Sequence, residues 1–461
     1  MYLYLIFLKI QIIPFHDFLT YIGKVLSSRE NKATEKLKPV PKIKDLLSKY
    51  KTPILFSGGS IVKSFAQMIV GFIIAKYISP TDLGLWATIS LAITYSVFLQ
   101  AGLINGLNLE LPYAYGKGQE EEAKILAGTV QTFTLFSSIT ILLLGVSSFV
   151  FFPFHDPKIK YGVLAVTLFI MLSYYQNYLM STFRSKNSFI RLSIIQVIDA
   201  FVNLITLIFV VYYSYYGLII KAVFVALIYV LLLHFLRPIK VRLLWNMIAI
   251  KKLLKVGLPI FALSYIVALS STADKLWLLK YSDLTNVGLY SFGFYAFSIF
   301  SLFSLSVASY IYPRMTYNYG KTNDRTLLWI YVKKITLLLF LIQITLASIG
   351  YFLVPVIITN YFSAYILSIR TMQILLFAGV FTGSVVGVNA LWSTKNWKYM
   401  ITYQVILSFL MVSLPYAGIQ LFSNKLIGVT YGVLLASFLN LITGITITYM
   451  ATHKNEHRYS S

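Results

Sequence analysis

The chain has 461 residues, of which 58% are hydrophobic and 12% are charged, and its formal net charge is +24. Soluble domains carry about a quarter charged residues, so this composition excludes a soluble multidomain protein and indicates a polytopic membrane protein. The chain has no cysteine and only five scattered histidines, which excludes disulfides, thiol chemistry and Cys-based metal sites. We therefore predict no cofactor.

Residues 1–53 precede the first membrane-length window and form a predicted cytoplasmic N-terminal extension. Their initial apolar run is interrupted by Lys9, Pro14 and Asp17 and is too short to span a membrane. The run lacks a basic n-region and a small-residue cleavage site, so a signal peptide is not expected. An interfacial helix and an over-long gene start remain as alternatives.

Twelve apolar windows follow, each near the length of about 20 residues that a helix needs to cross a bilayer. They predict an all-α membrane protein with spans at 54–78, 84–109, 124–152, 161–183, 190–213, 216–236, 256–281, 287–312, 328–354, 364–392, 399–422 and 427–451. Residues 54–237 form a predicted N-terminal lobe and 256–452 a C-terminal lobe. A basic linker at 238–255 joins the lobes, and 453–461 is a cytoplasmic tail.

The placement of the basic residues predicts the topology. If the N-terminus is cytoplasmic, most of the 39 Lys and Arg residues fall in the extension, the even-numbered turns and the tail. The positive-inside rule then places both termini in the cytoplasm. This placement assigns the basic charge to topology and to contact with membrane lipids, and not to nucleic-acid binding. Lys221 is counted with the outer group, and Lys63 lies in mid-span.

The two lobes repeat one another in sequence. Residues 76–86 (KYISPTDLGLW) match 280–290 (KYSDLTNVGLY) at an offset of 204, and the same offset relates 113–117 to 317–321. Two matches in register indicate a duplication, and they predict that Gly84 superposes on Gly288. Because six spans per copy is an even number, both copies have one orientation around an axis along the membrane normal. This symmetry is typical of transporters with a central site.

Polar side chains recur at helical spacing on several predicted spans. Such stripes turn away from lipid, towards either partner helices or a wet cavity, and their number favours a cavity. The predicted cavity residues are Gln67 on the first span, Asn105 on the second, Gln176 and Asn177 on the fourth, and Asn203 on the fifth, which also carries Asp199.

Three short segments resemble one known family. They are IAKYISPTDLGLW after the first span, GLING with LPYAYGKG after the second, and TADK with VGLY at the seventh. They are similar to segments of the Wzx-type lipid-linked oligosaccharide flippases, within the multidrug and oligolipid flippase superfamily. The resemblance covers about residues 52–452. The N-terminal extension departs from the family pattern.

The resemblance implies a fold and a function. The fold is a V-shaped pair of six-helix lobes around a central cavity. The function is transport of undecaprenyl-pyrophosphate-linked repeat units across the bacterial inner membrane, with a polysaccharide polymerase as a further partner. A pyrophosphate would need cations along a wet path, which makes Lys63, Lys275, Lys280 and Arg370 candidates for substrate binding. Each such cation costs about 2.5–3.5 kcal/mol in a membrane span.

Two intramembrane carboxylates, Asp199 and Asp274, are candidates for coupling transport to a proton or sodium ion. Lys63 and Asp199 each lie about nine residues from the cytoplasmic ends of their spans, and therefore at a similar depth of roughly 14 Å. An opposite charge within about 4–6 Å would keep both ionised. We therefore predict that they pair in the empty state. A static pair that locks two helices is the alternative.

Two other functions fit the sequence less well. A multidrug or organic-cation antiporter of the same superfamily would need acidic groups in its binding lobe, whereas here cations outnumber Asp199 and Asp274. A membrane polymerase or ligase would need a large outer loop with Arg and His, whereas the longest predicted outer links have about ten residues.

Overall fold

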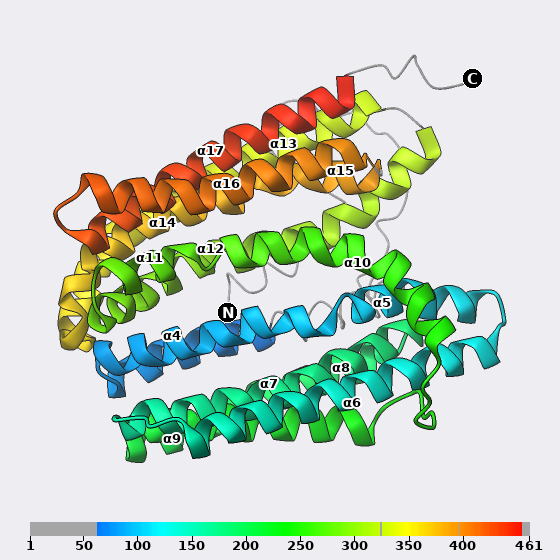
Figure 1. The fold of residues 1–461 in the computed structure, drawn as a ribbon. Helices are drawn as coiled ribbons and strands as arrows, with labels where there is room; N and C mark the ends of the chain where they lie inside the picture. The colour runs from blue at the N-terminus through cyan, green and yellow to red at the C-terminus, as the bar shows by residue number, and fades with distance from the viewer. Residues whose placement is uncertain (1–61, 323–324, 395, 454–461) are drawn as a thin grey trace, which may run out of the picture.

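The computed structural model describes residues 62–322, 325–394 and 396–453. These residues form helices joined by short turns (Figure 1). The extension, the start of the first span and the tail beyond 453 lie outside the described residues. Residues 62–77 are helical. The later helices are α4 (Pro80–Ser96), η1 (Val97–Gln100), α5 (Leu103–Gly116), α6 (Glu120–Phe151), α7 (Pro157–Ser185), α8 (Phe189–Ile205), α9 (Leu207–Phe235), α10 (Met247–Ser270), α11 (Ala273–Tyr281), α12 (Leu284–Thr322), α13 (Arg325–Tyr361), η2 (Ser363–Ser368), α14 (Ile369–Gly383), η3 (Val385–Val388), α15 (Asn389–Ser393), α16 (Trp397–Leu421) and α17 (Lys425–His453).

Within the described residues, ten helical segments are long and apolar enough to cross a membrane. The other two predicted spans are the first, described only from residue 62, and the fifth, which contains the 17-residue helix α8. The fifth span continues past Thr206 into the start of α9. The backbone then breaks at Ser214, where φ is 49°. This break lies between the predicted windows 190–213 and 216–236, so an all-α polytopic membrane protein is confirmed.

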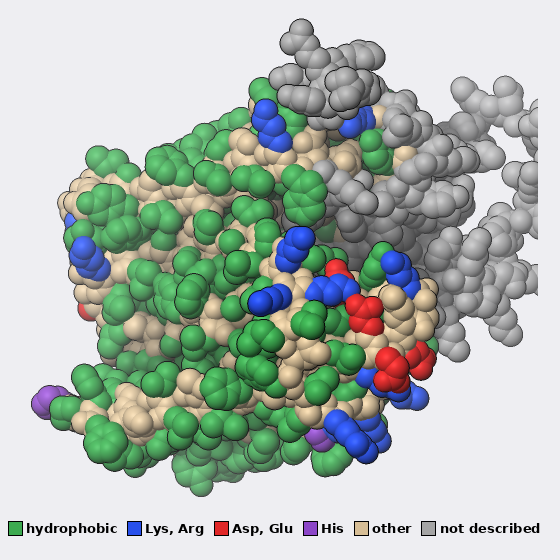
Figure 2. Space-filling view, turned by 45° about the vertical axis from the view of Figure 1, so that its right-hand side comes forward, with side chains coloured by type: hydrophobic (Ala, Val, Ile, Leu, Met, Phe, Trp, Pro, Cys, Tyr) green, Lys and Arg blue, Asp and Glu red, His purple; other side chains and the backbone are tan. Residues whose placement is uncertain are grey.

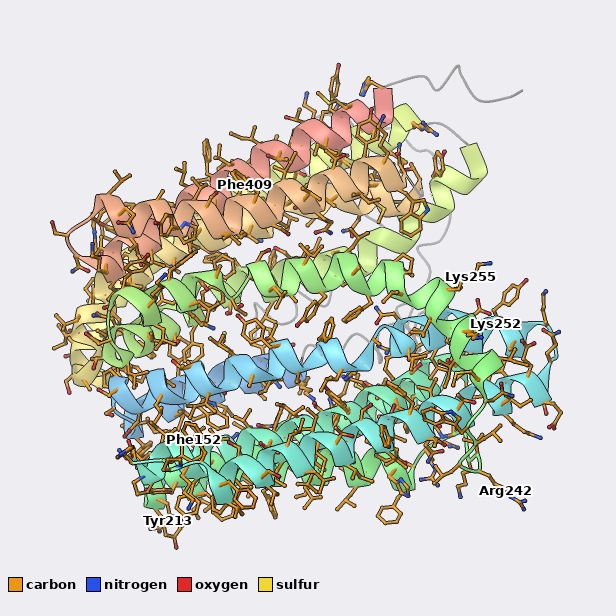
Figure 3. The ribbon with its side chains drawn as sticks, in the orientation of Figure 1. Phe152, Tyr213, Arg242, Lys252, Lys255 and Phe409 are labelled. Atoms are coloured by element: carbon orange, nitrogen blue, oxygen red, sulfur yellow. The ribbon has the colours of Figure 1, made fainter. Side chains whose placement is uncertain are left out.

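The helices form two bundles, one from residues 62–235 and one from α10 to α17 (Figure 1). We call them the N-terminal and C-terminal lobes. Arg242, Lys252 and Lys255 lie at one end of the molecule, and Phe152 and Tyr213 lie at the other (Figure 3). We call these the basic end and the opposite end. Charged side chains gather at the basic end, while hydrophobic side chains cover most of the visible surface along the helices (Figure 2).

The two lobes meet at the opposite end through equivalent positions of the repeat. Thr81 and Thr285, which are 204 residues apart, form a hydrogen bond between their hydroxyl oxygens at 2.8 Å. A Cβ added at Gly84 would lie 1.8 Å from the Leu284 carbonyl oxygen, and one added at Gly288 would lie 1.7 Å from the Pro80 carbonyl oxygen. These contacts are reciprocal because 80 and 84 correspond to 284 and 288. A two-fold relation therefore holds between α4 and α12, in the register that the offset of 204 predicts.

A second close contact joins the lobes nearer the basic end, where α10 packs on α5. The predicted span 84–109 is not one helix, because the backbone turns at Ala101 and Gly102 with φ values of 48° and 79°. A Cβ added at Gly102 would lie 2.8 Å from the Gly257 carbonyl oxygen. Glycine thus serves both the turn and the approach of α10. The sequence windows did not show this break because the segment is apolar throughout.

The start of α10 belongs to the predicted linker 238–255 but is helical. The Asn246 side chain accepts a hydrogen bond from the Ala249 N–H at 3.0 Å and so caps the helix. Ala249, Ile250 and Leu253 are buried in the core of the N-terminal lobe. The first turns of α10 therefore tie the C-terminal lobe to its neighbour, and the extended part of the connection ends before Met247.

Candidate functional site

The structure brings Lys63 and Asp199 together inside the N-terminal lobe. The Lys63 ammonium lies 2.9 Å from the Asp199 carboxylate, and their side chains are 21% and 3% exposed. The same ammonium lies 3.9 Å from the centroid of the Tyr229 ring, which is a favourable cation–π distance. The depth argument from the sequence therefore predicted this contact correctly.

Asn203 and Lys221 extend the ion pair deeper into the lobe. The Asn203 amide donates to the Asp199 carboxylate at 3.4 Å and to the Asp199 backbone carbonyl at 3.1 Å. The Lys221 ammonium donates to the Asn203 amide oxygen at 2.9 Å. We call Lys63, Asp199, Asn203, Lys221 and Tyr229 the N-lobe charge cluster. It contains two ammonium groups and one carboxylate, so it carries one positive charge in excess.

Helix periodicity positions the cluster. Asp199 and Asn203 are four residues apart on α8 and share one face, where both are buried. Lys221 and Tyr229 lie on α9, eight residues apart, which is close to two helical turns and again gives one face. The turn at Ser214 folds this part of α9 back along the fifth span. Lys63 reaches the cluster from the helical residues 62–77.

Lys221 corrects the sequence interpretation, which counted it among the outer basic residues. It is 5% exposed and hydrogen-bonded to Asn203 within the N-lobe charge cluster. Lys221 lies seven residues after the turn at Ser214, which corresponds to a depth of about 10 Å. That depth was the available signal. Tyr229 was missed because the sequence has many tyrosines in its spans.

The other polar candidates of the N-terminal lobe lie outside this cluster. Gln67 is exposed, and Asn105 and Asn177 are half-buried. Gln176 is also half-buried and contacts the sulfur of Met180 at 3.9 Å. The predicted stripes are present on their helices, but only Asn203 contacts the predicted ion pair.

The candidates of the C-terminal lobe do not form one group. Arg370 is exposed on α14 and donates to the Tyr431 hydroxyl at 3.2 Å and the Tyr351 hydroxyl at 3.5 Å. Lys275 is half-buried, with its ammonium 5.5 Å from the centroid of the Phe294 ring. Lys280 is exposed at the last turn of α11.

Asp274 is buried and held by neighbours that position α11. Its carboxylate accepts hydrogen bonds from the Tyr290 hydroxyl at 2.5 Å and from the Lys275 N–H at 2.7 Å. Since Tyr290 lies on α12, Asp274 connects the two helices on either side of the turn at Ser282. This geometry accounts for Asp274 as a helix-pairing residue without an ion.

An ionic contact at the basic end joins α10 to the N-terminal lobe. The Lys252 ammonium lies 3.0 Å from the Glu110 carboxylate and 2.6 Å from the Glu122 carboxylate. Figure 3 places Lys252 beside Lys255 at this end. Together with the glycine contact between α5 and α10, this bridge fixes the start of the C-terminal lobe against α5 and α6.

Comparison with solved structures shows the fold. An inward-facing multidrug resistance MATE family transporter of the MOP superfamily aligns with a TM-score of 0.65 and 13% identity, covering 85% of this chain and 94% of that one. The lipid II flippase MurJ in an inward closed conformation aligns with a TM-score of 0.65 and 17% identity, covering 87% and 88%. The Vibrio cholerae MATE transporter VcmN aligns with a TM-score of 0.59 and 15% identity, covering 88% and 97%.

Sequence comparison shows the family. No curated protein matches this chain. The family described as "Polysaccharide biosynthesis protein" matches residues 116–367, which is more than half of the chain. The match runs from the end of α5, through the rest of the N-terminal lobe and α10, to the η2 segment. The resemblance noted from the sequence is thus confirmed, and the chain belongs to the polysaccharide biosynthesis protein family and has the fold of the MATE and MurJ transporters.

Proposed function

We propose that this protein moves undecaprenyl-pyrophosphate-linked oligosaccharide repeat units across a bacterial inner membrane by ion-coupled alternating access, without enzymatic chemistry. The Lys63–Asp199 ion pair inside the N-terminal lobe is the observation that carries the proposal. The polysaccharide family and the flippase fold of MurJ support the class of cargo. A lipid-linked glycan places a charged pyrophosphate in the membrane, and a cation that can exchange partners is suited to receive it.

The N-lobe charge cluster provides such a cation. Lys63 is the more exposed partner of the pair, whereas Asp199, Asn203 and Lys221 are almost fully buried. Pyrophosphate that reaches the lobe would therefore meet Lys63 first and compete with Asp199 for it. A carboxylate that loses its counter-ion in a low-dielectric site takes up a cation or a proton. Substrate binding at Lys63 thereby drives uptake of a proton or sodium ion at Asp199.

Polarity follows from the basic end, which faces the cytoplasm in this proposal because basic loops are retained there. Both termini are then cytoplasmic. The glycine contact between α4 and α12 closes the external side in the described state. The membrane partners are the lipid-linked substrate, surrounding lipids and the polymerase machinery that receives the exported units.

An antiporter of drugs or organic cations is the second candidate, since solved MATE transporters share the fold. The charge balance of the N-terminal lobe disfavours it. A cationic cargo needs a carboxylate to bind it, whereas Asp199 is already matched by Lys63, and Lys221 adds a further positive charge. The excess positive charge attracts an anion.

Deleting the gene from its host should stop surface-polysaccharide export and leave undecaprenyl-linked repeat units facing the cytoplasm. The head groups of the repeat units cannot cross the hydrocarbon core unaided. Accessibility of the glycan to an external glycosidase, before and after spheroplast lysis, measures the sidedness. Re-expression of the wild-type chain should restore export, and the Lys63→Met variant should not. Normal lipid-linked units on the outer face, with only unlinked sugar nucleotides accumulating, would contradict the proposed function.

A further inference from the structure

An apolar groove runs along α10 and α11 at the seam between the two lobes, apart from the N-lobe charge cluster. Its volume is about 690 Å³, and it is open to the surface. The groove is lined by Tyr95 of α4 in the N-terminal lobe, by the face of α10 and α11 from Ile266 to Lys280, and by Val412 of α16. Residues from both lobes therefore form its walls.

Hydrogen bonds fix these walls. The Trp277 indole N–H donates to the Val412 carbonyl at 3.1 Å and joins α11 to α16. The Tyr95 hydroxyl lies 2.9 Å from the Thr272 hydroxyl, and the Tyr95 carbonyl accepts from the Tyr265 hydroxyl at 2.9 Å. The groove is thus built by contacts between three membrane-spanning segments, and a molecule that enters it comes from the lipid phase.

Lys280 gives the groove a chemical direction. Among the described residues that line it, Lys280 alone is charged, and it lies at the opposite end of the molecule. Its ammonium is 5.3 Å from the centroid of the Tyr281 ring and forms no ion pair within the described part of the chain. A chain in the groove would therefore have its anionic group beside Lys280.

The length of the groove distinguishes between lipids. Ile266 and Lys280 are 14 residues apart, which corresponds to at most about 21 Å along the helices. Half of a hydrocarbon core of about 30 Å is about 15 Å. A chain anchored at Lys280 thus continues past the midplane, where an ordinary acyl chain ends. A single long polyisoprenoid chain with a terminal phosphate meets this requirement.

We propose that this groove binds the polyprenyl chain of the lipid-linked substrate, with Lys280 contacting the first phosphate once the head group has reached the opposite end. The inference rests on the proposed flippase function and adds a site for the tail. Since α4 and α16 belong to different lobes, a tail in the groove contacts both lobes and stays at their seam while the head group crosses.

Photolabelling tests the site. The full chain is reconstituted in nanodiscs of phosphatidylethanolamine and phosphatidylglycerol with a polyprenyl monophosphate that carries a diazirine along its chain. We expect adducts within 266–280 and near Val412. Leu276→Trp, which fills the groove from a side chain that is 38% exposed, should lower this labelling at least fivefold. Lys280→Gln should require about tenfold more probe for the same labelling, because a charged hydrogen-bond partner is lost.

Leu258→Trp is the matched control, because Leu258 is exposed on the same helix α10 but does not line the groove. Labelling of this variant should equal that of the wild type. Adducts spread evenly over the lipid-facing helices would overturn the inference. So would equal labelling by a diazirine phosphatidylglycerol that polyprenyl phosphate does not displace, since the groove would then hold bulk lipid.

Transport of a polyprenyl-pyrophosphate oligosaccharide by the wild type in liposomes separates the two proposals. Transport without labelling in the groove overturns the tail site and leaves the flippase function standing. Labelling in the groove without transport overturns the flippase function, and with it the tail's role in export.

Discussion

Replacing Asp199 with asparagine should destabilise the protein by about 3–5 kcal/mol and abolish transport. Removing one partner of a buried ion pair leaves the other charge uncompensated, which is costly in low dielectric. Here two ammonium groups, of Lys63 and Lys221, would remain without the carboxylate between them. Thermal unfolding in detergent, followed by a transport assay at a permissive temperature, measures both effects.

Two further variants establish that the effect comes from the pair. The double variant Asp199→Asn with Lys63→Met should recover much of the stability, because it removes one of the unmatched charges, and it should still fail to transport. Glu121→Gln is the control for loss of an ion pair: Glu121 contacts Lys124 at 2.6 Å, but its side chain is 83% exposed. This substitution should not change the unfolding temperature measurably. Asp199→Asn behaving like Glu121→Gln would contradict the account of the cluster.

Replacing Gly84 with alanine should separate the lobes at the opposite end. The added Cβ would meet the Leu284 backbone carbonyl at 1.8 Å, and no side-chain rotation can relieve a clash with backbone. Overpacking of this kind costs about 1–3 kcal/mol, which shifts a two-state equilibrium by about 5- to 150-fold. The described state should therefore lose population to a state open at that end. Gly288→Ala should have the same effect, because the contact is reciprocal.

The absence of cysteine from the chain makes this shift measurable without background labelling. Spin labels on Lys76→Cys and Asp283→Cys, two exposed positions flanking the contact, report the distance between the lobes. Gly116→Ala is the matched control, because a Cβ there has no atom within 4 Å. A distance distribution that is unchanged in Gly84→Ala would mean that the α4–α12 contact does not gate the opposite end.

Patterns that depend on spacing alone could be predicted from the sequence. The repeat offset of 204 gave the register in which Thr81 meets Thr285 and Gly84 meets Gly288. Hydrophobic length gave the spans, including the boundary at Ser214. Equal depth gave the contact between Lys63 and Asp199. Each of these follows from the rise per residue or from symmetry, and neither depends on which helices are neighbours.

Features that depend on which helices pack together could not be predicted. The turn at Ala101 and Gly102 reflects the approach of α10, which an apolar window does not reveal. Lys221 was assigned to the outer surface because its depth was not compared with that of Asn203. Cations at the span ends were also ranked by depth alone. The structure places Arg370 against two tyrosines and Lys280 at the end of a lipid-facing groove.

The charge-swapped double variant Lys63→Asp with Asp199→Lys tests the central claim most directly, in liposomes that contain a polyprenyl-pyrophosphate oligosaccharide. The swap preserves the ion pair, so the protein should express and fold. It moves the cation to the buried position, where pyrophosphate cannot reach it, so the account predicts no translocation of the glycan while the wild type transports it. Translocation by the swapped variant at the wild-type rate would show that the pair only locks two helices, and it would contradict exchange of Lys63 between Asp199 and the substrate.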